Sequence, residues 1–223
     1  MFIKSLQLGA YKNLDIEQSQ WEVPEENVHF AVKKMCLTKM SESSKFKDIP
    51  FDEIYPDDRI VKKLSLEDVN TIKDLEDKVR QQMVNENMIN SVMRQVLDNV
   101  NVEYDDEAIE KAAEKMCEET RLNVEETELN MDLYYAHYGI ENVEILKELF
   151  VEEIKTAHLE METLEKIICV ENLEIEDDIF EQTKEEYLKN PEHRQNFHEG
   201  DFKKSLLFKK TIDRVVEYNA QKN

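Results

Sequence analysis

Residues that interrupt helices are scarce in this chain. Only three glycines and four prolines occur among its 223 residues. Glycine and proline are the strongest local breakers, so long stretches without them predict long helices. Charged residues make up 36% of the chain and hydrophobic residues 40%, a ratio that suits slender helices better than a compact globule. We therefore expect an elongated all-α protein.

Two long helices are predicted by apolar residues that recur every three or four positions. The first begins after Thr71, which forms a near capping box with Asp74, and continues for about seven turns. The second begins after Asn142 and continues to about Cys169. Residues in the middle of these two apolar stripes should be buried: Leu75, Val79, Ile154 and Leu164.

Two segments have similar sequences, "NVEYDDEAIEKAAEKM" at 101–116 and "NLEIEDDIFEQTKEEY" at 172–187. A fainter third copy is "EVPEENVHFAVKKM" at 22–35. Each copy has an extended apolar lead-in and then carboxylates, which favour the first turn of a helix. We expect a strand-like segment followed by a helix, over about 105–121 and 177–189. Five identities in sixteen positions do not establish a duplication, and simple reuse of capping signals is the alternative.

The remaining segments complete the predicted order of elements. Residues 1–23 look extended, and a helix should follow Pro24 to about Met40. A further helix over 124–140 should end at Gly139 in a left-handed cap, and Asp201 should cap the last helix. We divide the chain into an N-terminal segment with one helix, residues 1–46, and a helical domain, residues 47–223.

Charge and composition exclude several classes of partner. With 29 basic and 51 acidic residues the net charge is −22, which opposes binding to nucleic acid or to an anionic membrane surface. The sequence contains no apolar run long enough for a signal peptide or a membrane span. Three widely spaced cysteines are typical of reduced thiols in a core or groove. We expect a soluble cytoplasmic protein.

No catalytic motif is present. The sequence lacks a glycine-rich phosphate loop, a Cys-x-x-Cys pair and a His-Glu-x-x-His pair. His193 and His198 could be metal ligands, but solvated loop histidines are the simpler interpretation. Glu152, Glu153 and His158 could form a carboxylate–histidine pair, but they lie beside or opposite the apolar stripe, on a face that solvent should cover. We expect no enzyme activity, no metal and no cofactor.

The apolar residues point instead to binding. Nine methionines and seventeen Phe or Tyr residues occur in a strongly charged chain. Methionine is unbranched and polarizable, and surfaces that bind varied partners use it because it repacks easily. Met83 and Met93 fit better as core residues. The helix at 177–189 has apolar ends and a polar middle, so part of its surface could face a transient partner.

The order of segments resembles the trigger factor family of ATP-independent chaperones. The stretch "LGAYKNLDIEQSQWEVPEENVHFAVKKM" is similar to the segment that enters the family's isomerase domain, and "DIPFDEIYPDDRIVKKLSLEDVNTIKDLEDKVRQQM" to the segment that leaves it. From "VNVEYDD" to "FKKTIDRVVEYNAQ" the chain resembles the helical domain with its two arms, in which "YYAHYGIENVEILKELFVEEIK" looks like the arm turn and return helix.

The resemblance implies a chaperone that holds unfolded or nascent polypeptides between helical arms without nucleotide. Only "SESSK" stands where the isomerase core would lie, and the ribosome-docking domain is absent, so neither prolyl isomerase activity nor ribosome docking is expected. A scaffold with one dedicated protein partner is the alternative, and a homodimer is left open. The residues expected to bind clients lie on the predicted arms: Met116, Tyr134, Tyr138, Tyr187, Leu188 and Phe197.

Overall fold

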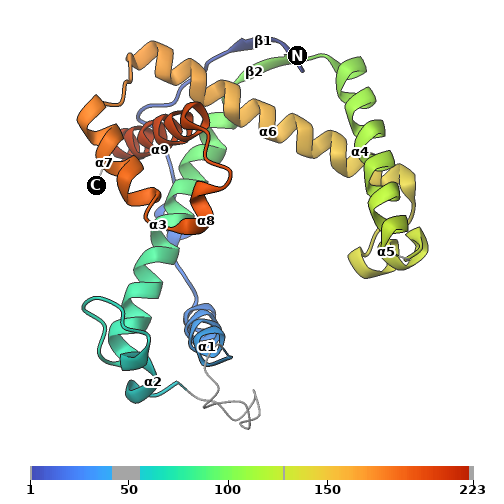
Figure 1. Cartoon of the computed structure of the whole chain (residues 1–223). Coiled ribbons are helices and arrows are strands. Elements are labelled where there is room, and N and C mark those ends of the chain that lie inside the picture. Colours follow the sequence, from blue (N-terminus) through green and yellow to red (C-terminus); the bar gives the residue numbers. More distant parts are fainter. Residues whose placement is uncertain (1, 42–55, 128, 221–223) are drawn as a thin grey trace. The chain divides into compact units, whose positions relative to one another are not determined.

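The computed structural model describes residues 2–41, 56–127 and 129–220. The chain divides into an inserted unit, residues 15–92, and a discontinuous unit, residues 1–14 and 93–223 (Figure 1). The predicted all-α class is confirmed, with a single two-stranded sheet in the described residues. The linker and the domain boundary predicted near residue 46 lie outside the described residues, and the elongated shape stays a prediction.

The inserted unit is built from helices. It contains a 3₁₀ turn (Gln18–Trp21), α1 (Glu25–Ser41), α2 (Asp58–Lys63) and the first part of α3 (Ile72–Asp98). On α1 the buried residues Val28, Val32 and Cys36 are spaced four apart and Leu37 follows them, so one face of the helix packs inward. The core consists of Val28, Val32 and Cys36 of α1, Val61 of α2, Val69, and Leu75 and Val79 of α3.

The start of α3 forms the predicted capping box. Thr71 Oγ1 accepts a hydrogen bond from the Asp74 backbone N–H at 3.1 Å, and Asp74 Oδ2 accepts one from the Thr71 N–H at 2.9 Å. These two bonds satisfy backbone donors that the first helical turn leaves unpaired. Further along α3, the Arg80 guanidinium donates to both carboxylate oxygens of Glu25 at 2.6 and 2.9 Å, and so joins α3 to α1.

The discontinuous unit contains the sheet, in which β1 (Ile3–Gln7) pairs antiparallel with β2 (Asn101–Tyr104). The lead-in of the first repeated phrase is therefore a strand, as expected. The corresponding lead-in at 173–176 is not a strand. A strand needs a partner for its backbone groups, and only the copy at 101–104 pairs with β1 in the described residues.

Two long helices form the next layer of this unit. α4 (Asp106–Glu126) lies antiparallel to α6 (Val143–Glu171), and α5 (Met131–Tyr138) lies at the end of the pair (Figure 1). Lys155 of α6 is 3.3 Å from Asp106 at the start of α4, whereas Lys147 reaches Glu110 one turn further along. The residues buried between the two helices are Ile109, Ala113 and Ile154.

The boundary between α4 and α5 differs from the prediction. α4 continues to Glu126, five residues beyond the expected end, and the helix expected over 124–140 begins only at Met131. The reason is local: the Asn130 side chain accepts the Leu133 N–H at 2.9 Å and starts a new helix there. Gly139, with φ of 66°, ends α5 as predicted, and Ile140 N–H donates to the Tyr135 carbonyl.

Three helices complete the unit: α7 (Asp177–Tyr187), α8 (Pro191–Arg194) and α9 (Glu199–Ala220), which packs on α6. Asp201 was expected to cap α9, and this is wrong. The helix begins at Glu199, three residues earlier than expected, and the His198 carbonyl accepts the Phe202 N–H, so Asp201 lies inside the first turn. The predicted burial of Leu75, Val79, Ile154 and Leu164 is confirmed.

The N-terminal segment is held by the ends of the helices in the discontinuous unit. The Asn219 side chain accepts the Leu14 N–H at 2.7 Å and donates to the Tyr11 carbonyl at 3.0 Å, and Asn219 itself is buried. Gly9 packs directly on the backbone of Asn99, whose side chain donates to the Ala10 carbonyl. We call residues 8–14 the strap.

Glu171, at the end of α6, binds three groups at once. Its carboxylate accepts the hydroxyls of Tyr11 and Tyr218, the latter at 2.6 Å, and lies 2.6 Å from the Lys12 ammonium. The bond to Lys12 and the two tyrosine hydroxyls lower the pKa of Glu171 from its ordinary value of 4.5 to about 2. One carboxylate thus ties the strap to α6 and α9.

We predict that Gly9→Ala destabilises the chain. A Cβ at this position would lie 1.9 Å from the Asn99 carbonyl oxygen, so backbone has to move. Overpacking of this kind costs about 1–3 kcal/mol. Chemical denaturation followed by circular dichroism measures the loss. Gly200→Ala is the matched control, because a Cβ there meets nothing within 4 Å and the first turn of α9 tolerates alanine.

A second prediction concerns pH. Because the folded-state pKa of Glu171 is depressed, its contribution to stability is complete above pH 4.5 and is lost as the pH falls toward 2. The difference in unfolding free energy between the wild type and Glu171→Gln should therefore shrink over this window. Glu160→Gln, on the same helix, controls for removal of a carboxylate in general. A difference that stays constant down to pH 2 would contradict the charge cluster.

Candidate functional site

Exposed apolar residues gather at the end of the α4–α6 pair. Eleven large apolar side chains are exposed in the described residues, and six of them lie between residues 122 and 149. We call this stretch the apolar tip. It includes Leu133, with 57% of its surface exposed, and Tyr138, with 62%. The other four are Leu122, Leu129, Val143 and Leu149. Exposed apolar groups that gather in one region often mark a binding surface.

The apolar tip is also acidic. Its sequence holds seven Asp or Glu residues against one base, Lys147. Lys147 is already engaged, because its ammonium lies 2.5 Å from Glu110 and 2.9 Å from Glu114 of α4. These two carboxylates raise the pKa of Lys147 well above its ordinary value. The surface beside the exposed apolar groups therefore carries excess negative charge.

A pocket of about 450 Å³ opens between the three helices of the tip. Its apolar wall is formed by Cys117 of α4, Met131 and Tyr135 of α5, and Val143 of α6. Burial raises the pKa of the Cys117 thiol, so the thiol stays protonated and behaves as an apolar group. The pocket has the size and lining to accept one large apolar side chain.

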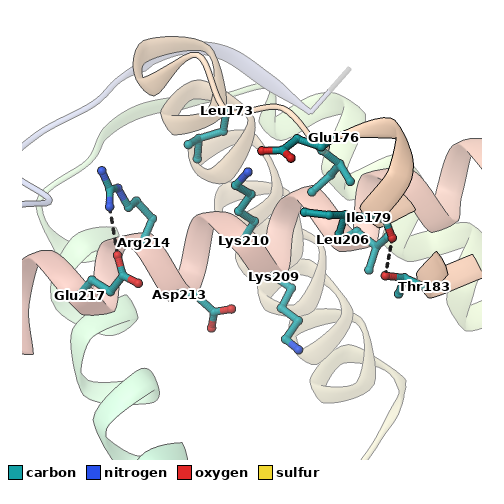
Figure 2. Close-up of a pocket in the computed structure, with 11 residues that line it drawn as sticks. Leu173, Glu176, Ile179, Thr183, Leu206, Lys209, Lys210, Asp213, Arg214 and Glu217 are labelled. Carbon is teal, nitrogen blue, oxygen red and sulfur yellow. Dashed lines mark hydrogen bonds and ion pairs between the residues drawn. The ribbon is translucent and has the colours of Figure 1, made fainter. Parts of the chain in front are cut away.

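A second apolar surface lies between α7 and α9, shown in Figure 2. This groove of about 550 Å³ has Leu173, Ile179 and Leu206 on its apolar side. Three cations of α9 (Lys209, Lys210 and Arg214) and three carboxylates (Glu176, Asp213 and Glu217) surround it. The Lys210 ammonium donates to the Glu174 carbonyl at 2.7 Å, and Arg214 pairs with Glu217 at 3.1 Å. The formal charges balance, unlike those of the apolar tip.

The structure brings two of the predicted client-binding residues together. Tyr187, at the end of α7, and Phe197, in the loop before α9, have ring centroids 6.2 Å apart. His193 stacks on Tyr187 at 4.1 Å, and its Nδ1–H donates to the Tyr187 carbonyl at 3.0 Å. These rings pack on one another, so each is only partly available to a ligand.

The other predicted residues are scattered. Met116 packs against the core between α4 and α6 rather than on an open surface. Tyr134 and Tyr138 lie one turn apart on α5, with ring centroids 4.7 Å apart, and Tyr138 belongs to the apolar tip. Leu188 is half-buried at the end of α7. The prediction that these residues bind clients therefore stays a prediction.

Sequence reasoning found Tyr138 but missed other exposed apolar residues of the tip. Leu133 and Leu149 were not singled out, because apolar residues were assigned to the core wherever a helical stripe was present. The spacing gave no warning, because Leu149 lies three residues after Leu146 and so fits the pattern of the α6 stripe. Its position on α6 turns it to solvent, with about half of its surface exposed.

Among the groups considered for chemistry, His158 has a packing role. His158 packs edge-on against Phe2 at 4.6 Å, while Glu152 and Glu153 are exposed. The three cysteines are free; Cys36 is buried, as expected of a core thiol, but Cys169 is exposed. No group of His, Cys, Asp or Glu in the described residues is arranged to hold a metal. No described helix is long and apolar enough to cross a membrane.

Comparison with known proteins gives one structural similarity. No protein-family model and no curated protein match the chain. A solved structure of the trigger factor chaperone is similar over 96% of this chain and 72% of that chain. That structure was described for promiscuous substrate recognition in the folding and assembly activities of the chaperone. The identity is 11% and the TM-score is 0.48. These values do not establish membership of that family, so the resemblance seen in the sequence stays a prediction.

Proposed function

We propose that this chain is an ATP-independent holdase, a cytoplasmic chaperone that binds unfolded or nascent polypeptides through the apolar tip. The observation that carries the proposal is the concentration of exposed apolar side chains at 122–149. Unfolded segments expose apolar residues of many sequences. Shallow, dispersed apolar contacts suit such ligands, because one deep pocket would select one of them.

The charge of the apolar tip defines which segments it prefers. The sequence of the tip holds seven carboxylates and one base, Lys147, which is already engaged. Like charges keep the tips of two molecules apart, and this offsets their tendency to associate. The same charges attract segments that combine apolar and basic residues, and this part of the attraction should weaken as salt is added.

We predict that Leu133→Ser combined with Tyr138→Ser impairs aggregation suppression. Loss of the apolar contacts that these two side chains would make with a bound client costs about 1.4 kcal/mol of binding free energy. Half-maximal suppression should therefore need about tenfold more protein. Light scattering of several unrelated denatured proteins measures the effect. Ile179→Ser is the matched control, since Ile179 is also an exposed apolar residue but lies in the α7–α9 groove.

The thermal midpoint separates binding from folding in this experiment. Leu133 and Tyr138 are exposed, so the double variant should have the same thermal midpoint as the wild type. Unchanged suppression with an unchanged midpoint would place the binding surface elsewhere. A wild-type chain that ignores every denatured protein would overturn the holdase and favour the alternative, a scaffold with one dedicated partner.

We further propose that the chain has no prolyl isomerase activity. Only five residues, "SESSK", stand where the resemblance would put the isomerase core. Five residues do not form a pocket that holds a proline and its neighbours. The slow refolding phase of a protein limited by proline isomerisation should keep its rate when the chain is added in substoichiometric amounts. A catalytic shortening of that phase contradicts the proposal.

A further inference from the structure

A small pocket of about 260 Å³ lies where α7, the loop after α8 and α9 meet. Three aromatic side chains line it: Tyr187 from the end of α7, Phe197 from the loop, and Phe202 from the first turn of α9. The rest of the lining is polar and consists of Asn196, His198, Asp201 and Ser205. We call it the aromatic pocket.

Packing fixes the three rings in place. The Tyr187 and Phe202 centroids are 4.8 Å apart, and the Phe197 and Phe202 centroids 5.5 Å, with the ring planes tilted by 37° and 55°. His193 stacks on Tyr187 from α8, and Phe180 supports Phe202 at 6.0 Å. A ligand would therefore meet rings that are already ordered, which reduces the entropy lost on binding.

The neighbouring ring shows which ligands these aromatics attract. The ammonium groups of Lys184 and Lys203 lie 5.4 and 5.5 Å from the centroid of Phe180, within the range of a cation–π contact. In the part of the chain that the structure describes, no Lys or Arg lies over Tyr187, Phe197 or Phe202. Two lysines already lie over Phe180, whereas the parts of these three rings that packing leaves open are not covered by a cation.

One carboxylate sets the charge of the aromatic pocket. Asp201 is exposed, makes no ion pair within the described residues, and is the lining residue with a formal charge when His198 is neutral. The start of α9 carries the positive end of the helix dipole, which opposes a cation. Asp201 and Glu199, both in that first turn, offset it. The Glu199 carboxylate lies 2.6 Å from the Lys184 ammonium, so this cation of α7 is already paired.

We propose that the aromatic pocket binds an alkylammonium group, such as a lysine side chain of a polypeptide or a small quaternary ammonium compound. The cation contacts the parts of the three rings that line the pocket, and Asp201 neutralises its charge. An anion would be repelled by Asp201 and by the ring faces. A neutral apolar group would use the rings but gain nothing from Asp201. The site does not depend on the chaperone activity proposed above.

The test compares a cation with its neutral isostere. The full chain is titrated at pH 8 and low salt with choline and, separately, with 3,3-dimethylbutan-1-ol, which has the same shape without charge. NMR signals of Phe197 and Phe202 report binding. Choline should bind saturably and roughly three- to thirtyfold more tightly than the alcohol, the range that a cation–π contact supplies. Equal affinities, or no shift with choline, overturn the proposal.

Variants test the two parts of the pocket. Asp201→Asn should weaken choline binding and leave the alcohol unaffected, whereas Asp213→Asn on the same helix should change neither. Phe197→Leu keeps apolar bulk and removes a ring face, so it too should weaken choline selectively. Choline binding unchanged in both Asp201→Asn and Phe197→Leu places the cation elsewhere and refutes the site. Circular dichroism confirms that each variant is folded.

A last arm distinguishes the two sources of the ammonium group. A blocked Gly-Lys-Gly peptide and its norleucine analogue compete against choline. Displacement by the lysine peptide alone supports a site for polypeptides, and failure of both peptides supports a site for small quaternary compounds. Equal displacement by lysine and norleucine peptides shows an apolar pocket and overturns the proposal. Aggregation suppression is not measured here, so the holdase can fail without affecting this result.

Discussion

The discontinuous unit depends on the contacts that join residues 1–14 to residues 93–223, which are the pairing of β1 with β2 and the binding of the strap. Bringing such segments together across an unfolded chain of about 80 residues costs about 4 kcal/mol in loop-closure entropy. The strap offsets this cost with directed bonds to the Asn219 side chain, which is buried, and to the Glu171 carboxylate. Leaving the buried Asn219 amide without these partners would cost free energy. The strap and the end of α9 therefore satisfy each other's hydrogen-bonding groups.

Packing weakens from the base of the α4–α6 pair toward the apolar tip. At the base Ile109, Ala113 and Ile154 are enclosed between two long helices. At the tip the third helix, α5, has eight residues, too few to be stable alone. The Asn130 side chain caps its first turn, Gly139 ends it in a left-handed conformation, and Tyr135 lines the pocket between the three helices. A helix this short does not bury all its apolar groups, and this is how Leu133 and Tyr138 come to be exposed.

Local signals predicted most of the elements, and distant partners decided the rest. The capping box at Thr71, the left-handed Gly139 and the four mid-stripe core residues follow from spacings of a few residues. The strap could not be predicted, because its bond to Asn219 joins residues 205 positions apart. The same limit applies to the candidate sites. The resemblance placed Met116 on an arm but did not show that it packs on the α4–α6 core, and no local spacing indicated that the Phe202 ring lines a pocket.

Charge links the surfaces that remain open. Many cations of this chain are bound internally, as Lys147 is by two carboxylates and Lys184 is by Glu181 and Glu199. The excess carboxylates stay at the surface, beside the exposed leucines of the tip and beside the rings of the aromatic pocket. Apolar or aromatic surfaces next to unpaired carboxylates favour partners that have both apolar groups and positive charge. The binding proposed for the apolar tip and the binding proposed for the aromatic pocket therefore rest on the same excess of carboxylates.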